Sequence, residues 1–205
     1  MWGEMPGIRV IPNAANFIAE KYSDCSAKRV IAVGRLDYQK SFDRLIRVWE
    51  KVHQQMPDWR LDIFGQGEWK EMLQGMIDER GLQETVKLNG PTKNIGQEYS
   101  ESSMIVMSSH YEGFPMVMIE AMACGLPAVS FDFKCGPRDI IKEGENGLVV
   151  KDGDIDGLAK AMMTLMRDDE LRRKMGENAK RVVETFSEAK VMDKWVRLYE
   201  ETIAD

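Results

Sequence analysis

The sequence is poor in cysteine and histidine and has no long apolar run, and each shortage excludes a class of protein. Its three cysteines, Cys25, Cys124 and Cys135, are odd in number and form no C-x-x-C pair, so we expect reduced thiols and no disulfide framework. No 18-residue apolar run and no signal peptide are present, which argues against a membrane-spanning or exported chain. No cluster with metal-ligand spacing is visible, so no metal site is predicted.

Basic residues are too few for a general nucleic-acid surface. The chain has 28 Lys and Arg against 34 Asp and Glu, a net charge of −6, whereas binding to phosphate backbones needs clustered Lys and Arg. We therefore expect no nucleic-acid partner, but one local phosphate pocket is compatible with this balance. The hydrophobic share of 43% is ordinary for a globular protein, and 205 residues can bury one sizeable core.

Apolar runs typical of strands alternate with helical periods along most of the chain. This alternation predicts a doubly wound parallel sheet, that is, an α/β Rossmann-like domain with helices on both faces. From Asp154 onward only helical periods remain, which predicts a helical C-terminal tail. The predicted strands cover 29–34, 59–64, 85–88, 105–107, 127–131 and 148–150. The predicted helices cover about 41–55, 68–80, 94–100, 154–167, 168–185 and 187–203, and further helices follow Pro115 and Gly136.

Two carboxylates, Glu112 and Glu120, lie eight positions apart around a Gly-Phe-Pro turn. Glu120 stands in an otherwise apolar run, and a buried carboxylate without a partner is strongly disfavoured, so it needs a partner from the protein or from a ligand. Pro115 fits the first turn of a helix, whose free amides and positive dipole end then face the turn. The segment predicts an anion-binding helix start for a ligand that carries both phosphate and hydroxyl groups.

A second group of candidate residues follows the first predicted strand directly. Arg35 and Lys40 lie in the loop between this strand and the next helix, and ligands of parallel sheets bind outside the carboxyl ends of strands. Two cations can neutralise a diphosphate. The alternative is a solvated loop in which both cations pair with Asp37 or Asp43, and the spacing alone leaves this open.

These segments together resemble the retaining GT-B glycosyltransferases of family 4 (group 1), whose E-x7-E motif matches Glu112 to Glu120. The resemblance covers most of the chain, from the segment 10–13 to the tail near Trp195 and Tyr199. The other matching motifs are Gly34-Arg35-Leu36-(x)3-Lys40, Phe64-Gly65-Gln66-Gly67, Gly90 with its loop, Cys135-Gly136-Pro137-Arg138-Asp139-Ile140-Ile141 and Glu145-Asn146-Gly147-Leu148-Val149. No first Rossmann domain precedes Val10, so the chain resembles the donor-binding half of a two-domain enzyme. Residues 1–24 would be an interdomain linker remnant and residues 25–205 the nucleotide-sugar-binding domain.

The resemblance implies a role for each candidate residue. Arg35 and Lys40 would hold the phosphates of the donor, Glu120 would accept hydrogen bonds from the ribose, and Glu112 would approach the transferred sugar. With Glu112, the two cations would form the catalytic set. The loop after Gly90 would cradle the base. The remaining residues would shape the sugar-binding turn, with backbone N–H groups offered by all but the proline: Gly113, Phe114, Pro115, Met116 and Val117.

The activity implied is transfer of a sugar, with retention, from a nucleotide diphosphate sugar to an acceptor hydroxyl. The donor is expected to be a UDP-sugar, and no cofactor or metal is implied beyond it. The acceptor, a saccharide or a lipid-linked saccharide, would be bound by the missing N-terminal domain, so the fragment alone is expected to be inactive. A cytoplasmic location is expected, with peripheral contact at the inner face of the membrane in the full-length protein.

Three other functions remain open, and two positions depart from the family pattern. The chain could belong to a GT-B sugar-nucleotide epimerase or to a non-catalytic nucleotide-sugar-binding module. A nicotinamide enzyme is suggested only by the G-x-G-x-x-K pattern that begins at Gly65, which lacks the third glycine of a dinucleotide fingerprint. Relatives usually have Glu at Asp139 and often Gly at Ser41. Cys135 lies beside the Gly136 turn and could be a reactive thiol.

Overall fold

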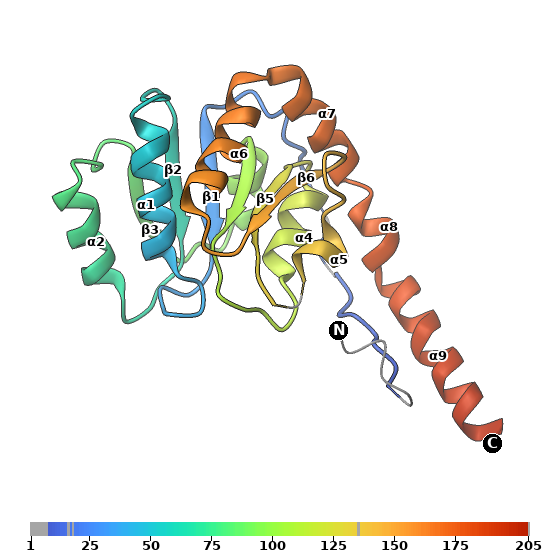
Figure 1. Ribbon diagram of the computed structural model, residues 1–205. Coiled ribbons are helices and arrows are strands. Elements are labelled where there is room, and N and C mark those ends of the chain that lie inside the picture. Colours follow the sequence, from blue (N-terminus) through green and yellow to red (C-terminus); the bar gives the residue numbers. More distant parts are fainter. Residues whose placement is uncertain (1–7, 16, 18, 135, 205) are drawn as a thin grey trace.

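A six-stranded parallel sheet forms the centre of the molecule (Figure 1). The computed structural model describes residues 8–15, 17, 19–134 and 136–204, so Cys135 and the reactivity of its thiol lie outside the described residues. The predicted α/β Rossmann-like fold is confirmed, and the ends of the strands differ from the predicted ones by one or two residues. The strands are β1 (Arg29–Val33), β2 (Arg60–Phe64), β3 (Val86–Gly90), β4 (Met104–Met107), β5 (Ala128–Asp132) and β6 (Gly147–Lys151).

The order of the strands, β3-β2-β1-β4-β5-β6, determines where a ligand can bind. From β1 the chain builds outward through β2 to β3, and it then returns to the other side of β1 to add β4, β5 and β6. The register places Val30 beside Met104 and Ile31 beside Ile105. Such a reversal opens a crevice outside the carboxyl ends of the two strands that flank it. Here these strands are β1 and β4, and the loops that follow them carry Arg35, Lys40 and Glu112.

Helices pack on both faces of the sheet, which explains why β4, one of its two middle strands, is apolar throughout. In the view of Figure 1, α1 packs with α2 and α6 in front of the sheet, and α4 packs behind it with α3, α7 and α8 as neighbours. The first helices are α1 (Phe42–His53), α2 (Lys70–Glu79), α3 (Ile95–Ser100), α4 (Met116–Ala123) and α5 (Pro137–Ile140). The later helices are α6 (Ile155–Arg167), α7 (Asp169–Ala179), α8 (Val182–Phe186) and α9 (Glu188–Ala204).

The C-terminal tail is helical as predicted, but the single helix expected over 168–185 is wrong. The structure divides it into α7 and α8, with Lys180 and Arg181 between them. The side chain of Arg172 anchors α7 to the body of the domain. This buried guanidinium donates to the carbonyl oxygens of Cys25 (2.9 Å) and Leu165 (2.6 Å), and so ties α7 to the start of the domain.

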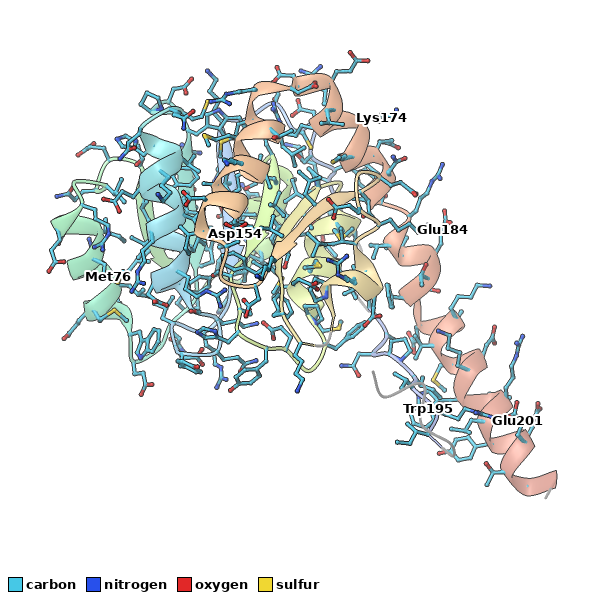
Figure 2. All side chains as sticks on the ribbon, in the orientation of Figure 1. Met76, Asp154, Lys174, Glu184, Trp195 and Glu201 are labelled. Atoms are coloured by element: carbon cyan, nitrogen blue, oxygen red, sulfur yellow. The ribbon has the colours of Figure 1, made fainter. Side chains whose placement is uncertain are left out.

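The last helix, α9, extends away from the body of the molecule, and the described residues near the N-terminus, 8–15, run beside it (Figure 1). Arg9 pairs with Glu201 at 4.0 Å, and both Trp195 and Glu201 lie well clear of the sheet in Figure 2. The apolar side chains that α9 leaves exposed fall on one stripe: Met192, Trp195, Val196, Tyr199 and Ile203. None of the described helices combines the length and the apolar character needed to cross a membrane.

Candidate functional site

The loops that follow β1 and β4 are tied together at the carboxyl edge of the sheet. The backbone N–H of His110 donates to the carbonyl oxygen of Gln39 (2.9 Å), and the Ser108 hydroxyl donates to the carbonyl oxygen of Lys40 (3.0 Å). Ser41 is buried in the left-handed region, at φ 51° and ψ 50°, and its hydroxyl contacts Asp43 Oδ1 at 2.9 Å. A serine can occupy the place of the family's glycine because its hydroxyl is hydrogen-bonded, which offsets part of the cost of this conformation.

Glu112 and Lys40, predicted separately from two distant segments, form a direct ion pair. Lys40 Nζ lies 2.6 Å from Glu112 Oε1, and only 6% of the Glu112 side chain is exposed. Ser109 Oγ donates to the same oxygen at 2.6 Å, and Gln39 Nε2 donates to Oε2 at 3.2 Å. The carboxylate therefore has three hydrogen-bond donors from the protein, and its charge is already balanced before any ligand binds.

Arg35 lies on the same loop as Lys40 but points into solvent. Its side chain is 71% exposed, and its Nε pairs with Asp37 at 3.1 Å, while Nη2 donates to Gln39 Oε1 at 3.1 Å. The alternative pairing considered from the sequence is thus present for Arg35, with Asp37, whereas Lys40 pairs with Glu112 instead. An exposed pair of this kind contributes little to stability, so Arg35 can change partner at low cost.

The start of α4 faces the Glu112 turn. Pro115 stands at the cap position and α4 begins at Met116, one residue later than expected. The Met116 N–H donates to the Phe114 carbonyl oxygen (2.9 Å) and is therefore already engaged. Within the described part of the chain, no acceptor is recorded for the N–H of Phe114 or of Val117. These two N–H groups can donate hydrogen bonds to an anion, and the positive end of the helix dipole favours its binding.

Glu120, in contrast to Glu112, has only one weak partner in the described part of the protein. It is partly buried on α4, and the Tyr99 hydroxyl donates to its Oε2 at 3.4 Å. Burial raises the pKa of Glu120 above its ordinary value, and the hydrogen bond from Tyr99 offsets this only in part. Among the described residues, no arginine side chain and no backbone N–H donates to this carboxylate. The carboxylate keeps most of its capacity to accept hydrogen bonds.

A comparison with known protein families identifies the family of this chain. The family model for glycosyl transferases, group 1, matches residues 16–182. The chain belongs to the group 1 glycosyl transferases. Two curated relatives are similar over almost all of it: an amylovoran biosynthesis glycosyltransferase of Erwinia amylovora, 36% identical over 198 residues, and an exopolysaccharide phosphotransferase of Streptomyces coelicolor, 34% identical over 200 residues.

The chain spans only part of these relatives. The alignments cover 93% of this chain and 55% of the Erwinia protein, and 97% of this chain and 21% of the Streptomyces protein. Among solved structures, an S. aureus TarM mutant in complex with fondaparinux, α-GlcNAc-glycerol and UDP matches with a TM-score of 0.86 and 28% identity. That match covers 96% of this chain and 40% of TarM. Fold and family thus agree, and both support the GT-B architecture.

Glycines of this group 1 domain allow two loops of the backbone to pack closely. This packing explains the G-x-G-x-x-K pattern, so a dinucleotide site is not needed to account for it. A Cβ on Gly65 would lie 1.8 Å from the Gly34 carbonyl oxygen, and one on Gly67 would lie 2.3 Å from the Leu36 carbonyl oxygen. The β2 loop can therefore approach the β1 loop only without side chains. Gly90 ends β3 with a positive φ of 72°, and its carbonyl oxygen accepts from the Gly65 N–H at 3.0 Å.

The second short helix near the site, α5, contributes to the shape of the site. A Cβ on Gly136 would lie 2.7 Å from Pro115 Cδ, so the start of α5 packs directly on the start of α4. Asp139, where relatives usually have Glu, is exposed on α5, and its N–H donates to the Gly136 carbonyl oxygen at 3.1 Å. Phe114 packs edge-on against Phe186 of α8, with ring centres 5.5 Å apart.

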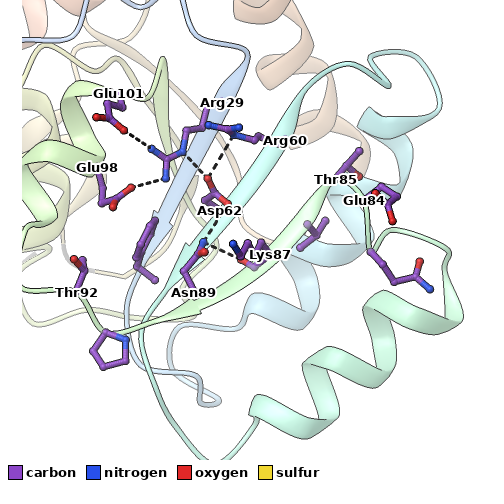
Figure 3. Close-up of a pocket in the computed structure, with 14 residues that line it drawn as sticks. Arg29, Arg60, Asp62, Glu84, Thr85, Lys87, Asn89, Thr92, Glu98 and Glu101 are labelled. Atoms are coloured by element: carbon purple, nitrogen blue, oxygen red, sulfur yellow. Dashed lines mark hydrogen bonds and ion pairs between the residues drawn. The ribbon is translucent and has the colours of Figure 1, made fainter.

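A polar cleft of about 670 Å³ lies elsewhere, on the open face of β1, β2 and β3 (Figure 3). Its charges neutralise one another: Arg29 reaches Asp62 and Glu98, each at 2.5 Å, from the middle of the cleft. Burial lowers the pKa of Arg29, but the hydrogen bonds that it donates to these two carboxylates outweigh burial and hold the pKa above its ordinary value. Pro91 and Thr92, from the loop expected to hold the base, are among the residues that line this cleft.

Two residues that support the site were not predicted from the sequence. Gln39 and Ser109 both donate to the carboxylate of Glu112. A signal existed for Ser109, because it precedes Glu112 by three positions, a spacing at which a hydroxyl can reach a carboxylate within one turn. Gln39 had no comparable signal, since its contact depends on the β1 and β4 loops being brought together by the fold.

Proposed function

We propose that this chain is the donor-binding part of a retaining, family 4 glycosyltransferase that takes a sugar from a UDP-sugar and transfers it to an acceptor hydroxyl. The observation behind the proposal is that the residues at α4 differ in how far the protein already satisfies their hydrogen-bonding groups. The helix start offers free amides beside a charge-balanced Lys40–Glu112 pair, while Glu120 retains unused acceptor capacity. A nucleoside diphosphate supplies the matching groups: phosphate oxygens for the amides and ribose hydroxyls for Glu120.

Each residue then has a distinct task in binding the donor. Arg35 exchanges its exposed partner Asp37 for a phosphate oxygen, and Lys40 adds positive charge from the floor of the site. The N–H groups of Phe114 and Val117 donate to phosphate or sugar oxygens, and the turn at Gly113 gives the ligand room, since nothing lies within 4 Å of a Cβ placed there. The loop after Gly90 borders the base.

The chemical contribution of the site is electrostatic. As the bond between the sugar and the diphosphate breaks, negative charge grows on the leaving phosphate oxygens, and fixed cations and amides stabilise it. Glu112, held by Lys40, Ser109 and Gln39, orients the sugar and does not act as a mobile base. The presence of UDP and α-GlcNAc-glycerol in the TarM structure supports this choice of donor class. The epimerase and the non-catalytic module gain no support from the relatives, which are named as transferases.

Calorimetry with UDP tests the proposal. Arg35→Ala should weaken UDP binding by roughly 1.5–3 kcal/mol, the scale of hydrogen bonds to charged groups. Lys28→Ala is the matched control, because Lys28 is similarly exposed but pairs with Asp58 at the opposite edge of the sheet. Equal affinity of the chain and of Arg35→Ala for UDP would remove the phosphate assignment.

A transfer assay tests whether the chain is sufficient by itself. We expect the purified chain to bind UDP-sugars and to form no product with glycoside or lipid acceptors, because the cleft that excludes water would need a second domain. Product formed well above the rate of hydrolysis would show that the chain is a self-sufficient enzyme.

A further inference from the structure

Tyr38 presents an aromatic ring at the rim of the site, beside Gln39 and Lys40. The side chain is 58% exposed, which is high for a large aromatic residue next to a charged crevice. Exposed aromatic residues are common when they occur singly on a surface, so exposure alone indicates nothing. Tyr38 differs from such residues because other aromatic side chains contact one face and one edge of its ring and hold it in a fixed position.

One face of the Tyr38 ring is stacked on the imidazole of His110. The ring centres are 4.5 Å apart and the planes differ by 24°. Trp69, from the loop after β2, meets Tyr38 edge-on at 6.2 Å, and its backbone N–H donates to the Leu36 carbonyl oxygen (3.0 Å). Three loops, after β1, β2 and β4, thus support a single exposed ring.

His110 is itself rigidly held, and its tautomer follows from its partners. Nδ1 lies 2.8 Å from Arg44 Nη1, and Nε2 lies 3.1 Å from Ser41 Oγ. Because a guanidinium can only donate, Nδ1 must accept, so the neutral ring carries its proton on Nε2 and donates it to Ser41. Arg44 is buried, pairs with Asp152 and lies over the Phe131 ring at 4.2 Å.

This arrangement fixes an aromatic surface that the fold itself does not cover. A tyrosine ring offers a large, rigid and amphipathic contact area at low entropic cost, and fixing it in advance increases the affinity for a flat apolar partner. A pyranose ring has such a face, formed by its C–H groups, and it carries hydroxyls at its edge. Polar groups for that edge are linked to Gln39, the residue after Tyr38: the exposed guanidinium of Arg35 donates to Gln39 Oε1 at 3.1 Å, and Gln39 Nε2 donates to the Tyr111 carbonyl oxygen at 3.2 Å.

We propose that the Tyr38 ring is a stacking surface for a pyranose ring bound at the Glu112 site. This inference rests on the proposed function and adds to it a residue that selects for the saccharide. The pyranose can come from the sugar of the donor or from the acceptor, and both sources present the same chemistry to the ring.

The test uses the chain with three substitutions, read by calorimetry. Tyr38→Ala removes the ring, Tyr38→Phe keeps it, and Tyr22→Ala is the matched control. Tyr22 is similarly exposed, but its ring contacts Lys180, at 4.6 Å, on a different part of the molecule. The probes for the donor are UDP, UDP-glucose and UDP-N-acetylglucosamine. For the acceptor, methyl glucoside and methyl N-acetylglucosaminide are added to the UDP-saturated chain, with binding followed by ligand-observed NMR.

The expected result is selective for the sugar. Tyr38→Ala should leave UDP affinity unchanged within about twofold and weaken either the UDP-sugars or the methyl glycosides about three- to tenfold, the range of aromatic stacking. Tyr38→Phe and Tyr22→Ala should match the unmodified chain. Whichever set of probes responds identifies the source of the pyranose. If thermal melting shows that Tyr38→Ala is unfolded, Tyr38→Leu, which keeps bulk over His110, takes its place.

Three outcomes would overturn the inference. If Tyr38→Ala changes neither set of saccharide probes while UDP still binds, the stacking surface is refuted and the proposed function stands. If UDP itself is weakened as much as the UDP-sugars, the ring contacts the nucleotide and not the sugar. If the unmodified chain binds no UDP, the proposed function fails and the inference fails with it.

Discussion

Glu112 and Glu120 are two carboxylates on the same turn and helix, yet their surroundings differ. Glu112 is buried with a lysine, a serine and a glutamine as donors, whereas Glu120 has one phenolic hydroxyl at 3.4 Å. The protein itself supplies hydrogen-bond donors to both oxygens of Glu112, but it leaves most of the acceptor capacity of Glu120 unused. The contrast indicates that Glu112 maintains the shape of the site, while Glu120 is available to a ligand. The following four predictions test this contrast, beginning with the largest expected effect.

Removing Lys40, the cation that pairs with Glu112, should destabilise the fold. Lys40→Met leaves the buried Glu112 carboxylate without its charge partner, which typically costs about 3–5 kcal/mol of unfolding free energy. Urea denaturation measures it. The double variant Lys40→Met with Glu112→Gln should recover most of the loss, because no buried charge remains. Arg35→Ala, which removes an exposed cation from the same loop, should stay within about 0.5 kcal/mol of the unmodified chain. A small effect of Lys40→Met would mean that Glu112 is not held by this pair.

Changing Glu120 should instead affect the binding of UDP. Glu120→Gln should weaken UDP by roughly 1.5–3 kcal/mol, as expected for loss of charge-assisted hydrogen bonds to a ribose. UDP-sugars should weaken by a similar factor, since they carry the same ribose. Titration calorimetry compares the two ligands directly. A loss confined to the UDP-sugars would move Glu120 from the ribose to the transferred sugar.

The same substitution at the other carboxylate should leave nucleotide binding almost unchanged. Glu112→Gln is expected to alter UDP affinity by less than about 0.5 kcal/mol, the usual range for changes without a direct contact. In the full-length enzyme it should impair transfer if Glu112 orients the sugar as proposed. If Glu112→Gln abolishes UDP binding and Glu120→Gln does not, the two roles are assigned backwards.

The smallest effect concerns the dependence of stability on pH. Because burial raises the pKa of Glu120 in the folded state, this carboxyl binds more protons in the folded than in the unfolded chain just above the ordinary value of 4.5. The contribution of Glu120 to stability therefore falls as the pH rises through the raised pKa. Glu120→Gln lacks this loss, so its stability relative to the unmodified chain should increase from pH 4 to neutrality. Urea midpoints at several pH values measure the difference, and a difference that is constant with pH would contradict the raised pKa.

The fold was predictable because its signals are local. The alternation of apolar runs and helical periods predicted all six strands within two residues, since buried parallel strands are apolar along their whole length. The break between α7 and α8 was not predictable, because neither Lys180 nor Arg181 is a helix breaker. Tertiary contacts fix α7 separately from α8: Arg172 donates to the carbonyl oxygen of Cys25, in the segment before β1.

The site was predictable only in part, for a related reason. Sequence spacing brought Glu112, Pro115 and Glu120 together because they lie within one turn and one helix. The pairing of Lys40 with Glu112 joins residues that are 72 positions apart, and the family resemblance assigned Lys40 to a ligand. Gln39, Tyr38 and His110 acquire their partners only when the β1 and β4 loops meet. Side-chain partners across such distances depend on tertiary structure.

The order of the strands also has a consequence for how the chain is made. The central strand β1 ends at Val33, but its neighbour β4 does not begin until Met104. At about 5–20 residues per second, a ribosome needs roughly 4–14 s to supply that neighbour. During this time one hydrogen-bonding edge of an apolar strand stays open, and exposed edges of this kind invite aggregation. Synthesis should therefore be the most vulnerable stage in the life of this protein, and its yield should depend on chaperones more than its final stability would suggest.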